Sequence, residues 1–299
     1  MRYESMSSSG PVSTTSLISF SEKVMFVLSD FPNVRAFSSS ISSLNFKVFF
    51  SLLTSVNASR DEFSCGGCED TLPPNVKRGA IRTGWILDTA KAYGYSISRE
   101  SGATLRVTWE AAPDALGSDA GNSSATLDAR GYFRLGPQHA AVAVRAAGAA
   151  AWGDERARRV FSAAGNGPAA SGFDFGRDAV GLLRGFDSDS IVAPLAAVAN
   201  VDYRLPIVRP QRGVGTLPLF LRSIHAAIFA DAGHAWDHGF RTSDIRVSTG
   251  AELSIDTVLG YWLPVTFTTS VAWRRDPVGN HDGVDFLVME FVAGTPVDT

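Results

Sequence analysis

Two short motifs carry the side chains best suited to chemistry, one built around an arginine and one around an aspartate. The first, Leu183-Arg184-Gly185-Phe186, lies in a Gly-rich stretch without a regular period. The second, Phe229-Ala230-Asp231-Ala232-Gly233, follows about 45 residues later, at the end of an alternating segment. A guanidinium can donate two parallel hydrogen bonds to one carboxylate, and such a pair contributes much more when shielded from bulk water than on a surface. An arginine on a loop and an aspartate at a strand end can therefore pin that loop.

The histidines are better explained as polar loop and strand residues than as metal ligands. His234 and His238 lie close to Asp231, and imidazole and carboxylate groups can bind a metal ion. Both histidines fall in a Gly-bounded hairpin loop and not on one face of a helix, so we interpret them as polar loop residues. His139 and His225 fall on the polar faces of expected strands. No metal site is expected.

Enzyme motifs are absent from the sequence. No Gly-x-Ser-x-Gly nucleophile elbow occurs. The stretch Asp187-Ser188-Asp189-Ser190 lacks the glycine and the final glutamate of a calcium-binding loop. The Cys65-Gly-Gly-Cys68 pair is not surrounded by a thioredoxin-like pattern, and we interpret it as incidental. The sequence thus predicts neither an enzyme nor a cofactor.

Composition narrows the class of protein further. The net charge of −3 and the absence of basic clusters give no indication of nucleic-acid binding. The longest apolar run, residues 140–152, contains Arg145 and is shorter than the roughly 20 residues of a membrane-spanning helix. A membrane β-barrel stays open, because its strands need only about 10 residues with every second one apolar.

The elements that must position the two motifs are β-strands. From about Gly84 onward, apolar and polar residues alternate with a period of two, most clearly over residues 124–135. Turns rich in Gly, Pro, Asp and Asn separate most of these segments. The pattern predicts an antiparallel meander of about nine strands, at residues 84–97, 103–112, 123–134, 138–149, 195–206, 220–231, 245–257, 261–273 and 283–293.

Two environments can produce strands with one apolar and one polar face. In a soluble sandwich the apolar face packs on a second sheet, whereas in a membrane barrel it contacts lipid and the polar face lines a wet lumen. Predicted lengths of 10 to 13 residues exceed the usual soluble value of about 5 to 6. Aromatic residues also lie near strand ends, as in an interfacial girdle: Trp85, Trp109, Tyr203, Tyr261 and Trp273. These features favour the membrane barrel.

Residues 1–78 differ in composition from the rest. They are rich in Ser, poor in Gly and without sustained periodicity, so we interpret them as a disordered or non-native leader. Residues 47–58 have the basic, apolar, small-residue order of an export signal, but their position about 45 residues into the chain argues against one. Residues 79–299 form the second expected domain.

A long insertion, at about residues 150–194, separates the fourth and fifth predicted strands. It is rich in Arg, Phe and Gly and includes Phe173-Asp174-Phe175-Gly176. Insertions of this length are usually functional or disordered, and this composition suits a segment folded back into a polar lumen. Residues 183–186 resemble the hydrophobic-Arg-Gly-aromatic motif on the inward-folded loop of the bacterial surface antigen family, the BamA-like outer-membrane barrels. Residues 229–233 resemble that family's Phe-x-Asp-x-Gly signature, which lies on the second strand after the loop.

The resemblance covers residues 79–293 and implies the roles of the motif residues. Arg184 reaches through the lumen to Asp231, Gly185 allows a close backbone approach, and Leu183 and Phe186 complete the loop motif, with Phe186 on the inner wall. Phe229, Asp231 and Gly233 form the partner motif of the barrel wall. The family barrel has sixteen strands, and only about the last nine are visible here, so the resemblance implies a partial, all-β, antiparallel transmembrane barrel.

The resemblance also implies a location and a role. The location is the bacterial outer membrane, and the role is insertion of outer-membrane proteins or protein translocation. The expected partners are outer-membrane lipid, unfolded or secreted protein substrates, and periplasmic modules absent from this chain, with no nucleic acid. Two alternatives stay open: a passive porin-like or structural barrel, and a soluble β-sandwich binding module.

Overall fold

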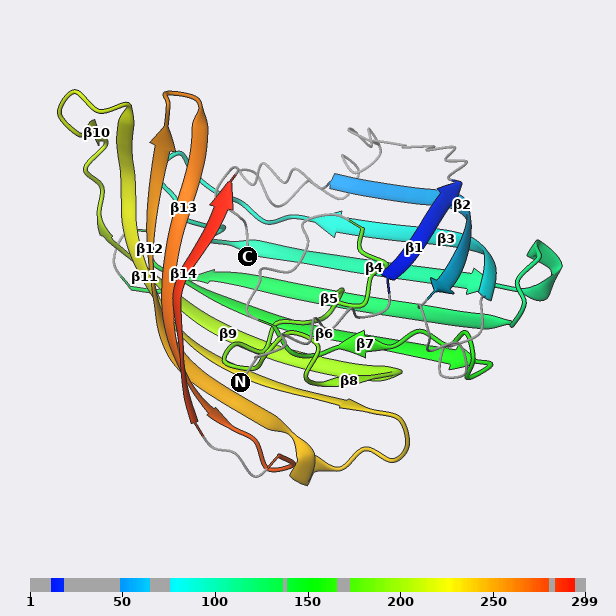
Figure 1. Ribbon diagram of the computed structural model, residues 1–299. Coiled ribbons are helices and arrows are strands. Elements are labelled where there is room, and N and C mark those ends of the chain that lie inside the picture. Colours follow the sequence, from blue (N-terminus) through cyan, green and yellow to red (C-terminus); the bar gives the residue numbers. More distant parts are fainter. Residues whose placement is uncertain are drawn as a thin grey trace, which may run out of the picture.

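One large antiparallel sheet dominates the computed structural model, which describes residues 12–18, 49–64, 76–136, 139–165, 173–279 and 283–293 (Figure 1). The sheet has 12 strands in the order β1-β2-β3-β4-β5-β6-β9-β11-β12-β13-β14, with β10 paired to β11. Strands β7 and β8 form a separate two-stranded sheet. The strands are β1 (Val12–Ile18), β2 (Phe49–Ser64), β3 (Val76–Asp88), β4 (Gly102–Ala112), β5 (Asn122–Arg134), β6 (Ala141–Gly153), β7 (Phe161–Ser162), β8 (Val192–Ala193), β9 (Leu195–Val208), β10 (Arg212–Gly213), β11 (Leu219–Trp236), β12 (Arg246–Leu259), β13 (Leu263–Arg275) and β14 (Gly283–Ala293).

The sheet curves into an open trough. In Figure 1, β3 to β6 run side by side, and the sheet bends through β9 so that β11 to β14 stand at a steep angle to them. Strands β1 and β14 lie at the two ends of the order and do not pair with each other among the described residues. Two 3-10 turns, Asp114–Leu116 and Thr242–Asp244, interrupt the connections between strands. Among the described residues, no helix is long and apolar enough to cross a membrane.

The predicted antiparallel meander is confirmed, and the nine predicted strands correspond to β3 to β6, β9 and β11 to β14. The first one was misplaced, because it was predicted at 84–97 and the strand is Val76–Asp88. The Oδ1 atom of Asp88 accepts a hydrogen bond from the backbone N–H of Ala90 at 2.9 Å, which turns the chain at the end of β3. The strand predicted at 138–149 also begins later, at Ala141, because His139 has a φ of 67° and belongs to the turn.

Part of the expected leader forms strands in this structure. Strands β1 and β2 lie within residues 1–78, and β2 pairs with β3 over residues 49–61. The expected boundary near residue 78 falls inside β3. The other residues before Val76, including Cys65 and Cys68, lie outside the described residues. A leader at residues 1–78 stays a prediction.

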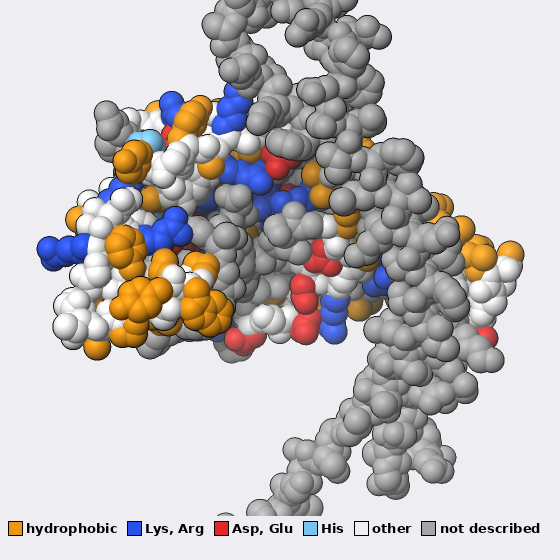
Figure 2. Space-filling view, turned by 90° about the horizontal axis from the view of Figure 1, so that it is seen from above, with side chains coloured by type: hydrophobic (Ala, Val, Ile, Leu, Met, Phe, Trp, Pro, Cys, Tyr) orange, Lys and Arg blue, Asp and Glu red, His pale blue; other side chains and the backbone are white. Residues whose placement is uncertain are grey.

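Burial along the strands is the reverse of that in a soluble sheet. On β5, the polar side chains of Ser124, Asp128 and Arg130 are buried, whereas Leu127 and Phe133 are 47% and 58% exposed. The same holds on other strands, where exposed apolar side chains include Trp109, Val201, Ile228, Leu253 and Trp273. In Figure 2, charged side chains gather towards the middle of the trough and many hydrophobic ones lie along its margins. Polar rows therefore line the concave face, and apolar rows face outward.

The soluble-sandwich alternative is wrong for the described part of the chain. A sandwich requires a second sheet over the apolar face. Within the described residues the only other sheet pairs β7 with β8, which have 2 residues each, and the apolar rows stay exposed.

A small apolar core lies inside the trough instead. Inward-facing alanines of β6 and β9 form a smooth wall against which the connection between these two strands packs. Fully or nearly fully buried side chains of that connection include Phe161, Val180, Leu183 and Phe186. Because alanine projects little from a sheet, this wall leaves space for larger loop side chains. The core thus holds the inward loop and with it the arginine motif.

Candidate functional site

The arginine motif lies on the connection between β6 and β9, residues 154–194, which we call the inward loop. The sequence predicted this loop at about residues 150–194, whereas β6 runs on to Gly153. The short β7–β8 pair and a bridge between Gly165 and Leu183 give the loop its own hydrogen bonds. These bonds join distant parts of the loop to one another, and Leu183 and Phe186 pack in the core formed with β6 and β9.

The structure brings Arg184 and Asp231 together in a bidentate pair. Arg184 donates from Nε to Asp231 Oδ2 at 2.8 Å and from Nη2 to Asp231 Oδ1 at 2.7 Å. The backbone N–H of Arg184 also donates to Oδ2 at 3.2 Å. Arg184 is 8% exposed and Asp231 is 1% exposed, so both charges are removed from bulk water. In such a site, loss of one partner leaves an uncompensated buried charge.

Two further wall residues complete the surroundings of the guanidinium. Arg184 Nη2 donates to Asp202 Oδ1 on β9 at 2.6 Å. The guanidinium carbon lies 3.7 Å from the ring centroid of Phe229, which is a cation–π contact. Asp202 also accepts a hydrogen bond from Arg204 at 3.1 Å, so the acidic and basic groups alternate along this wall.

The glycine of the arginine motif, Gly185, allows close packing of the loop on the wall. Gly185 has a φ of 83°, and a Cβ added there would lie 2.9 Å from the Cβ of Ala272 on β13. The carbonyl of Gly185 accepts a hydrogen bond from Arg274 Nη1 at 2.8 Å. The Arg274 guanidinium carbon lies 5.7 Å from the ring centroid of Phe186, and Phe186 is buried.

Glycines also allow close packing around the motif of the barrel wall, residues 229–233. A Cβ on Gly233 would lie 3.3 Å from Cγ2 of Val198 on β9, which is a tight contact, and 3.5 Å from Cδ2 of Leu183, which is an ordinary one. Phe229 pairs in register with Gly250 on β12, and a Cβ on Gly250 would lie only 2.5 Å from Cζ of the Phe229 ring. The missing side chain at Gly250 lets the ring lie flat beneath Arg184.

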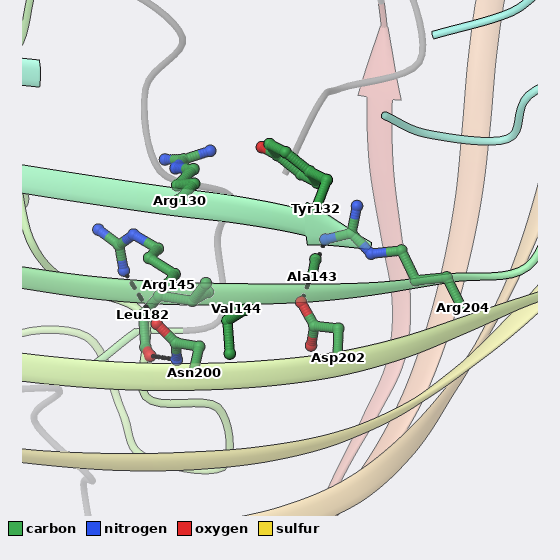
Figure 3. Close-up of a pocket in the computed structure, with 9 residues that line it drawn as sticks. All are labelled: Arg130, Tyr132, Ala143, Val144, Arg145, Leu182, Asn200, Asp202 and Arg204. Carbon is green, nitrogen blue, oxygen red and sulfur yellow. Dashed lines mark hydrogen bonds and ion pairs between the residues drawn. The ribbon is translucent and has the colours of Figure 1, made fainter. Parts of the chain in front are cut away.

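A polar row extends the pair across the sheet. Asp231 is in register with Asn200 on β9, Asn200 with Arg145 on β6, and Arg145 with Arg130 on β5. Asn200 donates to Asp231 Oδ1 at 2.8 Å and to the carbonyl of Leu182 at 2.6 Å. Arg145 donates to Asn200 at 3.1 Å (Figure 3). It also donates to Asp128 on β5 at 2.8 Å. Arg130, Arg145 and Asn200 of this row border a small cavity of about 10 Å³ on the inner wall, about the size that one water molecule needs.

The sequence did not predict the roles in this site of Asn200, Asp202, Arg145, Gly250 and Arg274. Alternation placed Asn200 and Asp202 on a polar face, which was a usable signal. Their meeting with Arg184 depends on the register between β6, β9 and β11, and alternation within single strands does not determine the register between them.

The other polar candidates lie apart from this pair. His234 stacks on Trp236 with ring centroids 5.5 Å apart, and His225 lies 3.5 Å from Asp256. His139 contacts Glu100 at 2.6 Å. Asp189 pairs with Arg177 in an exposed part of the loop. In the part of the chain that the structure describes, no three His, Cys, Asp or Glu side chains gather in a way that could hold a metal ion.

Comparisons with known proteins show which solved structures have a similar fold. No protein-family model matches the sequence, and no curated protein matches it. Among solved structures, BamA from Haemophilus ducreyi lacking POTRA domains 1–3 is similar, with a TM-score of 0.55 at 14% sequence identity. The likeness covers 82% of this chain and 51% of the BamA chain, so this chain spans about half the length of that structure.

The fold is thus that of a partial antiparallel β-barrel with a connection packed inside it. More particularly, it is a BamA-like barrel fold, with the sheet open between β1 and β14.

Proposed function

We propose that this chain is an outer-membrane β-barrel protein whose apolar outer face contacts lipid. The observation that carries this proposal is the reversed burial of the strands, with buried Asp128 and Arg130 on one face of β5 and exposed Leu127 and Phe133 on the other. In water, exposing a row of apolar side chains along several neighbouring strands would be unfavourable. A hydrocarbon environment favours such a row, because only apolar side chains are tolerated on the lipid face of a barrel.

Strand lengths support the same environment. The 13 residues of β5 span about 43 Å at the usual rise of about 3.3 Å per residue. A strand tilted by about 45° then rises about 30 Å, which exceeds the roughly 25 Å of a barrel's apolar band.

The proposed role is insertion of outer-membrane proteins or movement of proteins across the membrane. The likeness to BamA supports this role at the level of fold. Strands at a sheet edge offer unpaired backbone groups to an incoming chain, which is a route for strand-by-strand templating. A passive pore is the less favoured role, because Leu183 and Val180 of the inward loop are fully buried against the inner wall. Lipid and unfolded outer-membrane or secreted proteins are the partners that this role requires.

Lipid association is tested with the full chain refolded in detergent and mixed with phospholipid vesicles. We expect it to float with the vesicles in a density gradient and to aggregate when detergent and lipid are both withheld. An outward Leu127→Arg substitution should lower recovery in the vesicle fraction, because a cation at mid-membrane costs about 2–4 kcal/mol. Thr126→Arg, on the neighbouring inward-facing residue, is the matched control. A monodisperse chain in plain buffer would contradict the proposal.

The role itself needs a second assay. Vesicles that contain the chain should accelerate the insertion of an unfolded outer-membrane protein relative to empty vesicles. Equal insertion rates in the two kinds of vesicle would contradict the assembly role, but they would not contradict the proposal that the chain is a lipid-embedded barrel.

A further inference from the structure

A second part of the inward loop contacts a different region of the wall from Arg184. Arg159 donates from Nε to Glu110 Oε1 at 2.6 Å and from Nη2 to Glu110 Oε2 at 2.9 Å. Its third nitrogen, Nη1, donates to the carbonyl of Phe175 at 2.7 Å. One guanidinium therefore joins two separate stretches of the loop to strand β4.

Glu110 is the charge centre of this contact. It is 1% exposed, and besides Arg159 it accepts hydrogen bonds from Arg78 and Arg82 on β3. Arg78 also donates to Asn122 on β5 at 2.7 Å, which links the cluster to a third strand. A single buried carboxylate thus holds three guanidinium groups together, and its loss would leave them to repel one another.

Two phenylalanines of the loop pack on β3 beside these ion pairs. A Cβ on Gly84 would lie 2.2 Å from Cδ1 of Phe173, so Gly84 forms a notch in β3 that the ring occupies. The Arg82 guanidinium carbon lies 5.3 Å from the ring centroid of Phe175. The Phe173-Asp174-Phe175-Gly176 stretch, which stood out in the sequence only by its composition, therefore packs on β3.

We propose that Arg159, Phe173 and Phe175 form a second anchor of the inward loop, seated on Glu110, Arg82 and Gly84, and that this anchor can release while the Arg184 anchor stays closed. We call it the β3–β4 anchor. The two anchors share no residue, and the Arg159 side chain is 20% exposed whereas that of Arg184 is 9% exposed, so water reaches the β3–β4 anchor more readily. Between β4 and β11 in the sheet order lie β5, β6 and β9, so the loop spans the concave face from one anchor to the other.

Release of the β3–β4 anchor uncovers the polar wall of β3 and β4. The Arg184 pair keeps the rest of the loop against β9 and β11. The lumen then opens on one side only, which gives the barrel a partly open state without unfolding of the arginine motif. This last step rests on the proposed function, since it requires a lipid-embedded barrel with a lumen.

Hydrogen–deuterium exchange of the full chain in detergent tests the anchor itself. In Arg159→Gln and Glu110→Gln, we expect amides of residues 155–165 and 173–177 to exchange roughly tenfold faster, because a charge-assisted contact that holds them is lost. Amides of residues 183–186 should keep their wild-type rates. Arg184→Gln should give the opposite pattern.

Arg156→Gln is the matched control, because Arg156 is an exposed arginine of the same loop. If Arg159→Gln exchanged like Arg156→Gln, the second anchor would be wrong. If it accelerated residues 183–186 as strongly as residues 155–165, the two anchors would not be independent, and the proposal would also fail.

Conductance across planar lipid bilayers tests the opening. Arg159→Gln should spend more time in a partly conducting state than wild type or Arg156→Gln. Faster exchange with unchanged conductance would overturn the opening step. If the wild-type chain did not enter bilayers at all, the proposed function would fail, whereas the exchange experiment in detergent would still decide whether the anchor exists.

Discussion

At the scale of single residues, Arg184 has the largest expected effect on stability, because it is almost fully buried and contacts three wall side chains. Its guanidinium donates to Asp231 and Asp202 and lies over the ring of Phe229. A lysine at this position would keep the charge but lose the planar, two-pronged geometry that matches a carboxylate. The contribution of this contact to stability is thus a property of the geometry and not of charge alone.

A double-mutant cycle measures that contribution. Arg184→Gln and Asp231→Asn should each lower the free energy of unfolding by about 3–5 kcal/mol, because each leaves a buried group without its partner. The double variant should lose less than the sum, with a coupling free energy of at least about 1.5 kcal/mol. The measurement is urea unfolding of the chain in lipid vesicles.

The exposed pair Arg177–Asp189 on the same loop, with side chains 46% and 50% exposed, is the control for this cycle. Its coupling free energy should be below about 1 kcal/mol. Additive effects for Arg184→Gln and Asp231→Asn would show that the contact does not stabilise the fold.

At the scale of elements, the turn at residues 276–279, which follows β13, depends on one carboxylate. Asp276 accepts hydrogen bonds from the backbone N–H groups of Val278 and Gly279, and from Arg246 at 2.8 Å. Partial burial works to raise the pKa of Asp276, but the hydrogen bond from Gly279 and the neighbouring Arg246 outweigh it and hold that pKa below its usual range.

This direction fixes the pH dependence of the turn. A carboxylate with a lowered folded-state pKa stabilises the fold above its unfolded pKa of about 3.9, and the stabilisation is lost as the pH falls through the folded value. Wild type should therefore unfold at a higher temperature than Asp276→Asn near neutral pH, and the difference should shrink below about pH 4. A difference that stayed constant down to pH 2 would contradict the role of this ionised side chain.

Alternation within single strands was enough to predict the meander, and it located eight of the nine strands near their observed positions. It failed at residues 84–97, where the polar residues after Asp88 make a turn whose side-chain hydrogen bond has no periodic signature. The pairing of Asn200 with Asp231, and of Glu110 with Arg159, depends on strand register and on the path of the loop, which local patterns do not encode.

At the scale of the whole molecule, the inward loop links distant strands of an open sheet. Arg184 holds it to Asp202 on β9 and Asp231 on β11. Gly185 and Phe186 contact Arg274 on β13, and Arg159 holds the loop to β4. The apolar core formed with the alanines of β6 and β9 lies between these contacts. The loop therefore connects strands that are not neighbours in the sheet.

The outward apolar face is tested most directly by a spin-label scan along β5, from residue 124 to residue 133, with the chain in lipid vesicles. Labels at 125, 127, 129, 131 and 133 should collide with oxygen dissolved in the lipid, and labels at the alternate positions should be shielded from it or accessible to a water-soluble reagent. The contrary result is a scan without a period of two, or one in which the labels at 127 and 133 meet water and not lipid.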